Sequence, residues 1–225
     1  MKTFRKVIYA FVFASLALLI ISCRSRAESV APESLTKPES LTKPESLTAI
    51  ESPAIKQLVE AAIEQTQYTR YYDPAYVKIP YPGGDVTRER GVCTDVVIRA
   101  FRKVGIDLQK DVHEDMKQNF SVYPKRWGLR KPDTNIDHRR VPNLMTYFKR
   151  KGKSLTVTDD PKNYKPGDIV AWDLGGGVLH TGIVTNALSD ESKRYRIVHN
   201  ICCGAQLEDA LMSWKIIGHY RYFNQ

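Results

Sequence analysis

Apolar positions between residues 53 and 152 recur with the period of amphipathic helices. The first run follows Ser52, which can cap a helix, and Pro53, which suits a first helical turn. Its apolar members fall at i, i+3, i+4, i+7 and i+8, namely Ile55, Leu58, Val59, Ala62 and Ile63. The same period predicts three more helices, over residues 93–105, 108–120 and 142–152.

After Gly152 the pattern changes to short runs rich in β-branched and aromatic residues. These predict strands over residues 155–157, 168–173, 178–186, 194–200 and 217–223. Helices followed by strands, which we expect to form an antiparallel sheet, favour the α+β class over an alternating parallel fold. Residues 121–140 show no clear period, and such a long irregular insert in a compact domain is often a binding loop.

The first 23 residues have the pattern of an export signal. Basic residues precede an apolar stretch, residues 7–21, that is shorter than the roughly 20 residues needed to span a bilayer. The stretch ends in Ile-Ile-Ser-Cys at Cys23, which resembles the lipobox of bacterial lipoproteins. That resemblance implies a signal peptide over residues 1–22 and lipidation of Cys23. The alternatives are an uncleaved short anchor and a simple secreted protein.

A repeat follows the signal. The hexad Pro-Glu-Ser-Leu-Thr-Lys begins at Pro32 and Pro38, and a near copy begins at Pro44. Such a repeat has no apolar period and cannot build a core, so residues 23–51 are predicted to be a disordered tether and 52–225 a single domain. Extended at about 3 Å per residue, the tether would reach on the order of 50 Å.

The charge of the chain is basic, with 34 Lys and Arg against 25 Asp and Glu. Removing residues 1–23 removes three basic residues and leaves 31 − 25 = +6. For an exported chain this suits anionic lipid head groups or anionic wall polymers better than nucleic acid, although ordinary solubilising charge is an alternative. We expect a monomer at the periplasmic face of the outer membrane.

The strongest chemical signal is a cysteine at a predicted helix start. Cys93 lies in Gly-Val-Cys-Thr-Asp over residues 91–95, where unpaired N–H groups and the helix dipole favour a thiolate. His180 and His199 follow in two strand-like runs, in a nucleophile-then-base order. Asn200 competes with His199 for the third position, because strand alternation places these two neighbours on opposite faces.

In their order along the chain, these residues resemble the NlpC-type cell-wall peptidases, a papain-like family of cysteine hydrolases. The matching pieces are Pro80-Tyr81, Gly83-Gly84, Cys93, Pro166-Gly167-Asp168-Ile169-Val170, His180-Thr181-Gly182-Ile183-Val184 and Val198-His199. The resemblance implies a papain-like fold with Cys93 as nucleophile and His180 as general base and acid. It also implies His199 as the orienting residue and Tyr81 beside the cleft.

Two features qualify the resemblance. The family's usual Asp-Cys-Ser-Gly is Val-Cys-Thr-Asp here, from residue 92 to residue 95. The domain is closer still to a bacterial group known only as a domain of unknown function, through residues 135–142 and 218–222. The family implies a cofactor-free envelope hydrolase acting on peptide or amide bonds of peptidoglycan. The alternatives are a non-catalytic envelope binding lipoprotein of the same fold and a thiol acyltransferase.

Several other residues have candidate roles. Asp95 is expected to pair with the helix N-terminus rather than act as a catalytic acid, whereas Arg139 and Arg140 are candidates to meet substrate carboxylates. No metal is expected, although His199 with the adjacent Cys202 and Cys203 also admits a zinc site. Either of these two cysteines could instead pair with Cys93 and inactivate it by oxidation.

Overall fold

The computed structural model describes residues 47–224. The predicted signal peptide, the lipidation site Cys23 and most of the predicted tether lie outside the described residues. Within the described part of the chain, no helix is long and apolar enough to cross a membrane.

The four predicted helices are present, and the last three begin and end within two residues of their predicted bounds. They are α2 (Pro53–Glu64), α3 (Cys93–Lys103), α4 (Leu108–Asn119) and α5 (Val141–Arg150). In α2, the predicted apolar positions Ile55, Leu58 and Val59 are buried, which explains why its period could be read from the sequence.

A five-stranded antiparallel sheet follows the helices, in the order β6-β5-β4-β3-β7. Its strands are β3 (Ile169–Asp173), β4 (Leu179–Leu188), β5 (Tyr195–Asn200), β6 (Ala205–Glu208) and β7 (Lys215–Tyr220). The α+β class with an antiparallel sheet is therefore confirmed. The strand predicted at 155–157 is wrong, because only Ser154 forms a bridge there, with Tyr220.

A second, smaller pairing was not predicted. Strand β1 (Tyr71–Tyr72) runs parallel to β2 (Arg90–Gly91), which places Tyr72 opposite Gly91. Two-residue strands leave no periodic signal, so only the folded chain reveals them. This pairing brings Tyr72 close to the start of α3.

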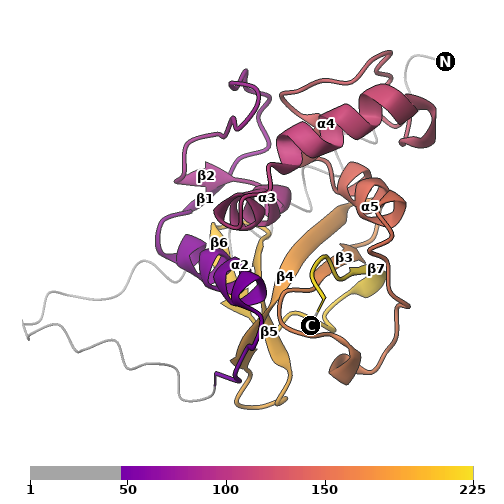
Figure 1. The fold of residues 1–225 in the computed structure, drawn as a ribbon. Helices are drawn as coiled ribbons and strands as arrows, with labels where there is room; N and C mark the ends of the chain where they lie inside the picture. The colour runs from indigo at the N-terminus through magenta and orange to yellow at the C-terminus, as the bar shows by residue number, and fades with distance from the viewer. Residues whose placement is uncertain (1–46, 225) are drawn as a thin grey trace, which may run out of the picture. The chain divides into compact units, whose positions relative to one another are not determined.

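The two faces of the large sheet have different neighbours. One face contributes Ile169, Ala171, Ile183 and Val198 to a core shared with α2, α3 and α5. The alternate residues Val170, Trp172, Val184 and Ile197 pack on the other face, against Tyr164 and Leu211. Figure 1 shows α2 and α3 over the sheet near β4, with α5 beside them.

The chain enters the domain at the end of β4. Leu47 bridges Ala187, and the N–H of Thr48 donates to the carbonyl of Asn186 over 3.1 Å. The side-chain amide of Asn186 in turn donates a hydrogen bond of 2.9 Å to the Thr48 carbonyl. The contacts of the domain thus already include Leu47, ahead of the boundary predicted at residue 52.

Candidate active site

Cys93 is the first residue of α3, and a buried ion pair fixes that end of the helix. Asp95 accepts the N–H of Val92 over 2.7 Å, which satisfies one of the unpaired donors at the helix start. Its carboxylate also takes two hydrogen bonds of 2.9 Å from the Arg139 guanidinium. The Arg139 and Asp95 side chains are only 2% and 4% exposed. Asp95 therefore has the structural position expected from the sequence.

Arg139 holds a second segment as well. Its Nη1 donates to the carbonyl of Ala75, and its Nη2, which also donates to Asp95, donates to the carbonyl of Asp73, each over 3.0 Å. One guanidinium thus joins α3 to the loop that follows Tyr72. Because the charge of Arg139 is balanced by Asp95, Arg139 adds little net positive charge to the site and mainly holds its segments in place.

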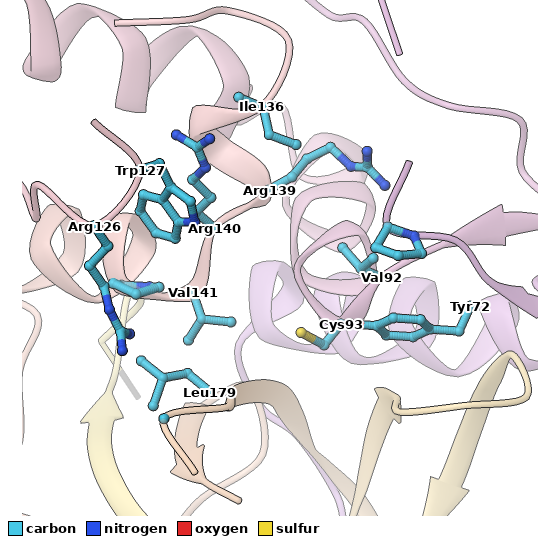
Figure 2. A pocket seen from close by; sticks show the side chains of 13 residues that line it. Tyr72, Val92, Cys93, Arg126, Trp127, Ile136, Arg139, Arg140, Val141 and Leu179 are labelled. Atoms are coloured by element: carbon cyan, nitrogen blue, oxygen red, sulfur yellow. The ribbon is translucent and has the colours of Figure 1, made fainter. Parts of the chain in front are cut away.

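The sulfur of Cys93 points into a cavity of about 210 Å³ (Figure 2). We call this the Cys93 cavity. Its lining residues are Tyr72, Pro74, Val92, Cys93, Arg126, Trp127, Ile136, Arg139, Arg140, Val141, Pro142, Gly177 and Leu179. Three of them are arginines, and none is a histidine, an aspartate or a glutamate.

Burial dominates the protonation of the thiol. Cys93 is 4% exposed, and loss of solvation raises its pKa to about 12, with a further rise from Asp95. Backbone N–H groups of Thr181, Thr94 and Cys93 itself act in the opposite direction and lower the pKa. The thiol is therefore protonated at neutral pH, although its position at a helix start predicted a thiolate.

The expected histidines meet each other but not Cys93. His180 Nε2 lies 2.7 Å from His199 Nδ1. Both rings pack against Trp214, and the His180 ring also stacks on Trp172. Trp172 belongs to the face of the sheet that turns away from α3. The structure therefore does not bring Cys93, His180 and His199 together, because the face of the sheet that carries His180 turns away from α3.

A carboxylate completes the histidine pair. His199 Nε2 lies 2.8 Å from Glu208 Oε2, and this hydrogen bond lowers the pKa of Glu208. An ionised Glu208 requires His199 Nε2 to donate. Burial, followed by the charge of His199, lowers the pKa of His180 to about 3. His180 is thus held neutral.

The structure also separates the two candidates for the third residue. His199 contacts His180, whereas Asn200 lies on the face turned toward α3. The amide of Asn200 donates to the Gly91 carbonyl over 3.0 Å, and Asn200 is fully buried. Asn200 therefore supports strand β2, just before Cys93.

Tyr81 does not line the Cys93 cavity. Its ring contacts His113 edge to face, with centroids 5.0 Å apart, and the residue is 40% exposed. The tyrosine of the cavity is Tyr72, whose pKa is raised by burial and then by the charge of Cys93. No motif marks Tyr72, because its position depends on the short β1–β2 pairing.

The irregular insert supplies one wall of the cavity. Arg126, Trp127 and Ile136 come from residues 121–140, the stretch predicted to be a binding loop, although none of the three was singled out as a candidate. The guanidinium of Arg140 lies over the Trp127 ring, 4.1 Å from its centroid, and pairs with Asp137 over 3.2 Å. An exposed aromatic residue between basic residues is the signal that marks this stretch in the sequence.

Cys202 and Cys203 are exposed, whereas Cys93 is buried. Among residues 47–224, no group of three or more His, Cys, Asp or Glu side chains is arranged to hold a metal ion. The zinc site considered from the sequence therefore has no geometric support in this part of the chain.

Comparison with known proteins places the chain among uncharacterised relatives. It is 52% identical over 166 residues to the uncharacterized protein YijF of Escherichia coli strain K12, covering 74% of this chain and 80% of that one. A solved N-acetylmuramoyl-L-alanine amidase from Bacteroides uniformis covers 76% of this chain and all of its own, at 14% identity and a TM-score of 0.44. A Staphylococcus aureus structure described as similar to a lipoprotein of the NLP/P60 family has 13% identity and a TM-score of 0.37.

This chain spans about half of that S. aureus structure, 46% of its length, while the match covers 81% of this chain. These structural similarities are too low to transfer an activity. The model of the domain of unknown function DUF1287, by contrast, matches residues 59–222, which include both faces of the sheet and every wall of the Cys93 cavity. The chain belongs to the DUF1287 family.

Proposed function

We propose that the Cys93 cavity binds a carboxylate-bearing peptide of the bacterial cell wall. The observation that carries this proposal is the basic wall of the cavity, and above all Arg126. Among the described residues, Arg126 has no ion pair and no hydrogen bond, whereas Arg139 is matched by Asp95 and Arg140 by Asp137. A guanidinium can hold a carboxylate through two parallel hydrogen bonds.

Sequence features support the bacterial cell wall as the source of the peptide. The export signal, the lipobox at Cys23 and the order of the NlpC-like motifs all favour an envelope protein that meets peptidoglycan. Peptidoglycan peptides carry free carboxylates, which suit a basic cavity without acidic lining residues.

Cysteine hydrolysis is the second candidate, favoured by the Cys93 sulfur inside the same cavity. In this scheme the sulfur forms a bond to the carbonyl carbon and the C–N bond breaks. The leaving amine takes the thiol proton, and water then cleaves the thioester. In this scheme the backbone N–H of Cys93 at the helix start stabilises the oxyanion. His180 takes no part, because it lies on the other face of the sheet.

Binding is tested with the full chain, soluble wall peptides and an arginine pair from the same insert. Arg126→Gln should weaken binding roughly ten- to a hundredfold, since a hydrogen bond to a charged group contributes roughly 1.5–3 kcal/mol. Arg130→Gln is the matched control, because Arg130 is exposed and does not line the cavity. Equal affinities of the wild type and Arg126→Gln would overturn the proposal.

Hydrolysis is tested separately with purified wall sacculi. Soluble fragments released by the wild type but not by Cys93→Ala would establish the second candidate, and their masses would identify the bond. If neither protein releases fragments while both bind, the cavity is a binding site only.

A further inference from the structure

A second depression adjoins the Cys93 cavity. Its volume is about 510 Å³, and it shares two wall residues, Pro142 and Leu179, with that cavity. It lies where α5 approaches β7, with Met145 on one side and Ile217 on the other. Because the two hollows share these side chains, they lie next to each other, and we call the pair the cleft.

The far part of this cleft is aliphatic. Leu155 and Val157 line it, with 39% and 40% of their surfaces exposed. Their segment is attached to β7 by the Ser154–Tyr220 bridge and by a bond of 2.8 Å from Leu155 N–H to the His219 carbonyl. The apolar residues that suggested a strand therefore line an open groove. We call this part of the cleft the 155/157 groove.

Each of the two hollows also carries one basic side chain without an ion pair among the described residues, Arg126 in the Cys93 cavity and Lys149 in the other. Lys149 lines the 155/157 groove and makes no ion pair within residues 47–224, and no acidic residue lines either hollow. Exposed aliphatic surface flanked by unpaired basic groups marks a binding groove rather than ordinary surface. The complementary ligand has carboxylates on both sides of an apolar middle.

We propose that the cleft holds one extended peptide. A carboxylate of the peptide lies against Arg126 in the Cys93 cavity, an aliphatic side chain lies in the 155/157 groove, and a second carboxylate faces Lys149. This inference rests on the proposed function and extends it, because it specifies an apolar residue and a second acidic group in the ligand.

The test uses the full chain and the probe acetyl-Glu-Ala-Leu-Ala-Glu, labelled for fluorescence anisotropy. Replacing the probe's leucine by asparagine should weaken binding to the wild type about tenfold, because the aliphatic contact is lost. Val157→Asp should weaken binding of the leucine probe by a similar factor and should no longer distinguish the two probes. Val77→Asp is the matched control, since Val77 is 43% exposed and lines neither hollow.

The outcomes separate the two proposals. If the leucine and asparagine probes bind the wild type equally while Arg126→Gln still weakens both, the groove assignment fails and the carboxylate site stands. If Arg126→Gln has no effect on either probe, the proposed function fails. The comparison of probes uses the native protein, so a folding defect in Val157→Asp does not decide the result.

Discussion

Two effects of opposite sign act on the thiol of Cys93. Three backbone N–H groups lower its pKa, whereas burial raises it, and the raised value of about 12 shows that burial is larger. A reactive cysteine needs its thiolate, so ligand binding or solvent entry must change this balance before Cys93 can attack.

Alkylation of Cys93 by iodoacetamide should therefore be slow at neutral pH. In a Cys202→Ser, Cys203→Ser background, the rate should rise about tenfold per pH unit through pH 9, because the thiolate fraction rises in that proportion below the pKa. Mass spectrometry of the labelled peptide gives the rate at each pH. A plateau below pH 9 would show that the helix start determines the thiol's protonation after all.

The sequence predicted those features of the site that depend on neighbouring residues, and missed those that depend on contacts between distant parts of the chain. Cys93 was placed correctly at a helix start because caps and helical period are local. The resemblance implied that His199 faces His180 from the neighbouring strand, whereas strand alternation alone left Asn200 as an alternative. Alternation along a strand gives the residues that share a face, but not the face that the helices cover. Only the folded structure could therefore reveal that His180 and Cys93 lie on opposite sides of the sheet.

At the scale of elements, the turn into β6 depends on Gly204. Its φ is +101°, and a Cβ there would lie 2.3 Å from the Thr69 carbonyl oxygen. This close approach packs the turn against the segment just before β1, and so helps to fix the side of the domain that carries Tyr72.

Gly204→Ala should lower the free energy of unfolding by more than 2 kcal/mol, because backbone must move in addition to adopting a strained φ. Gly152→Ala is the control, since Gly152 has φ +67° but no atom within 4 Å of the added Cβ. It should cost about 1 kcal/mol. Urea unfolding of both variants checks the difference, and equal losses would rule out the steric contribution.

Helices and strands could be predicted from the sequence when they were long enough to show a repeated pattern of apolar residues. The four helices have ten or more residues and a repeated apolar period, and they were predicted. Strands β1, β2 and β6 have two to four residues and were missed. Residues 155–157 have strand-like side chains, but the contacts at the sheet edge leave them outside the ladder.

At the scale of the whole molecule, two buried histidines link stability to pH. Burial lowers the pKa of both His180 and His138 to about 3, from a usual value of 6.5. Above pH 6.5 both are neutral in the folded and the unfolded chain. As the pH falls from 6.5 toward 3, only the unfolded chain gains these protons, so the folded state loses stability.

The free energy of unfolding should thus fall between pH 6.5 and pH 4.5, by up to about 1.4 kcal/mol per pH unit for each histidine. Urea unfolding at pH 7.5, 6.0 and 5.0 measures the slope. His180→Gln removes one of the two groups and should make the slope shallower. An unchanged slope, or an NMR titration of the His180 ring above pH 5, would contradict the assignment.

The bridge between Leu47 and Ala187 attaches the leading chain to one end of β4. Leu179, at the opposite end of β4, is a wall of the Cys93 cavity, and at 3.3 Å per residue the strand separates Leu179 from Ala187 by roughly 26 Å. A pull on the leading chain would therefore act on the end of the strand remote from the cavity. If Cys23 is anchored, the length of β4 therefore lies between the Cys93 cavity and the point where the leading chain joins the domain.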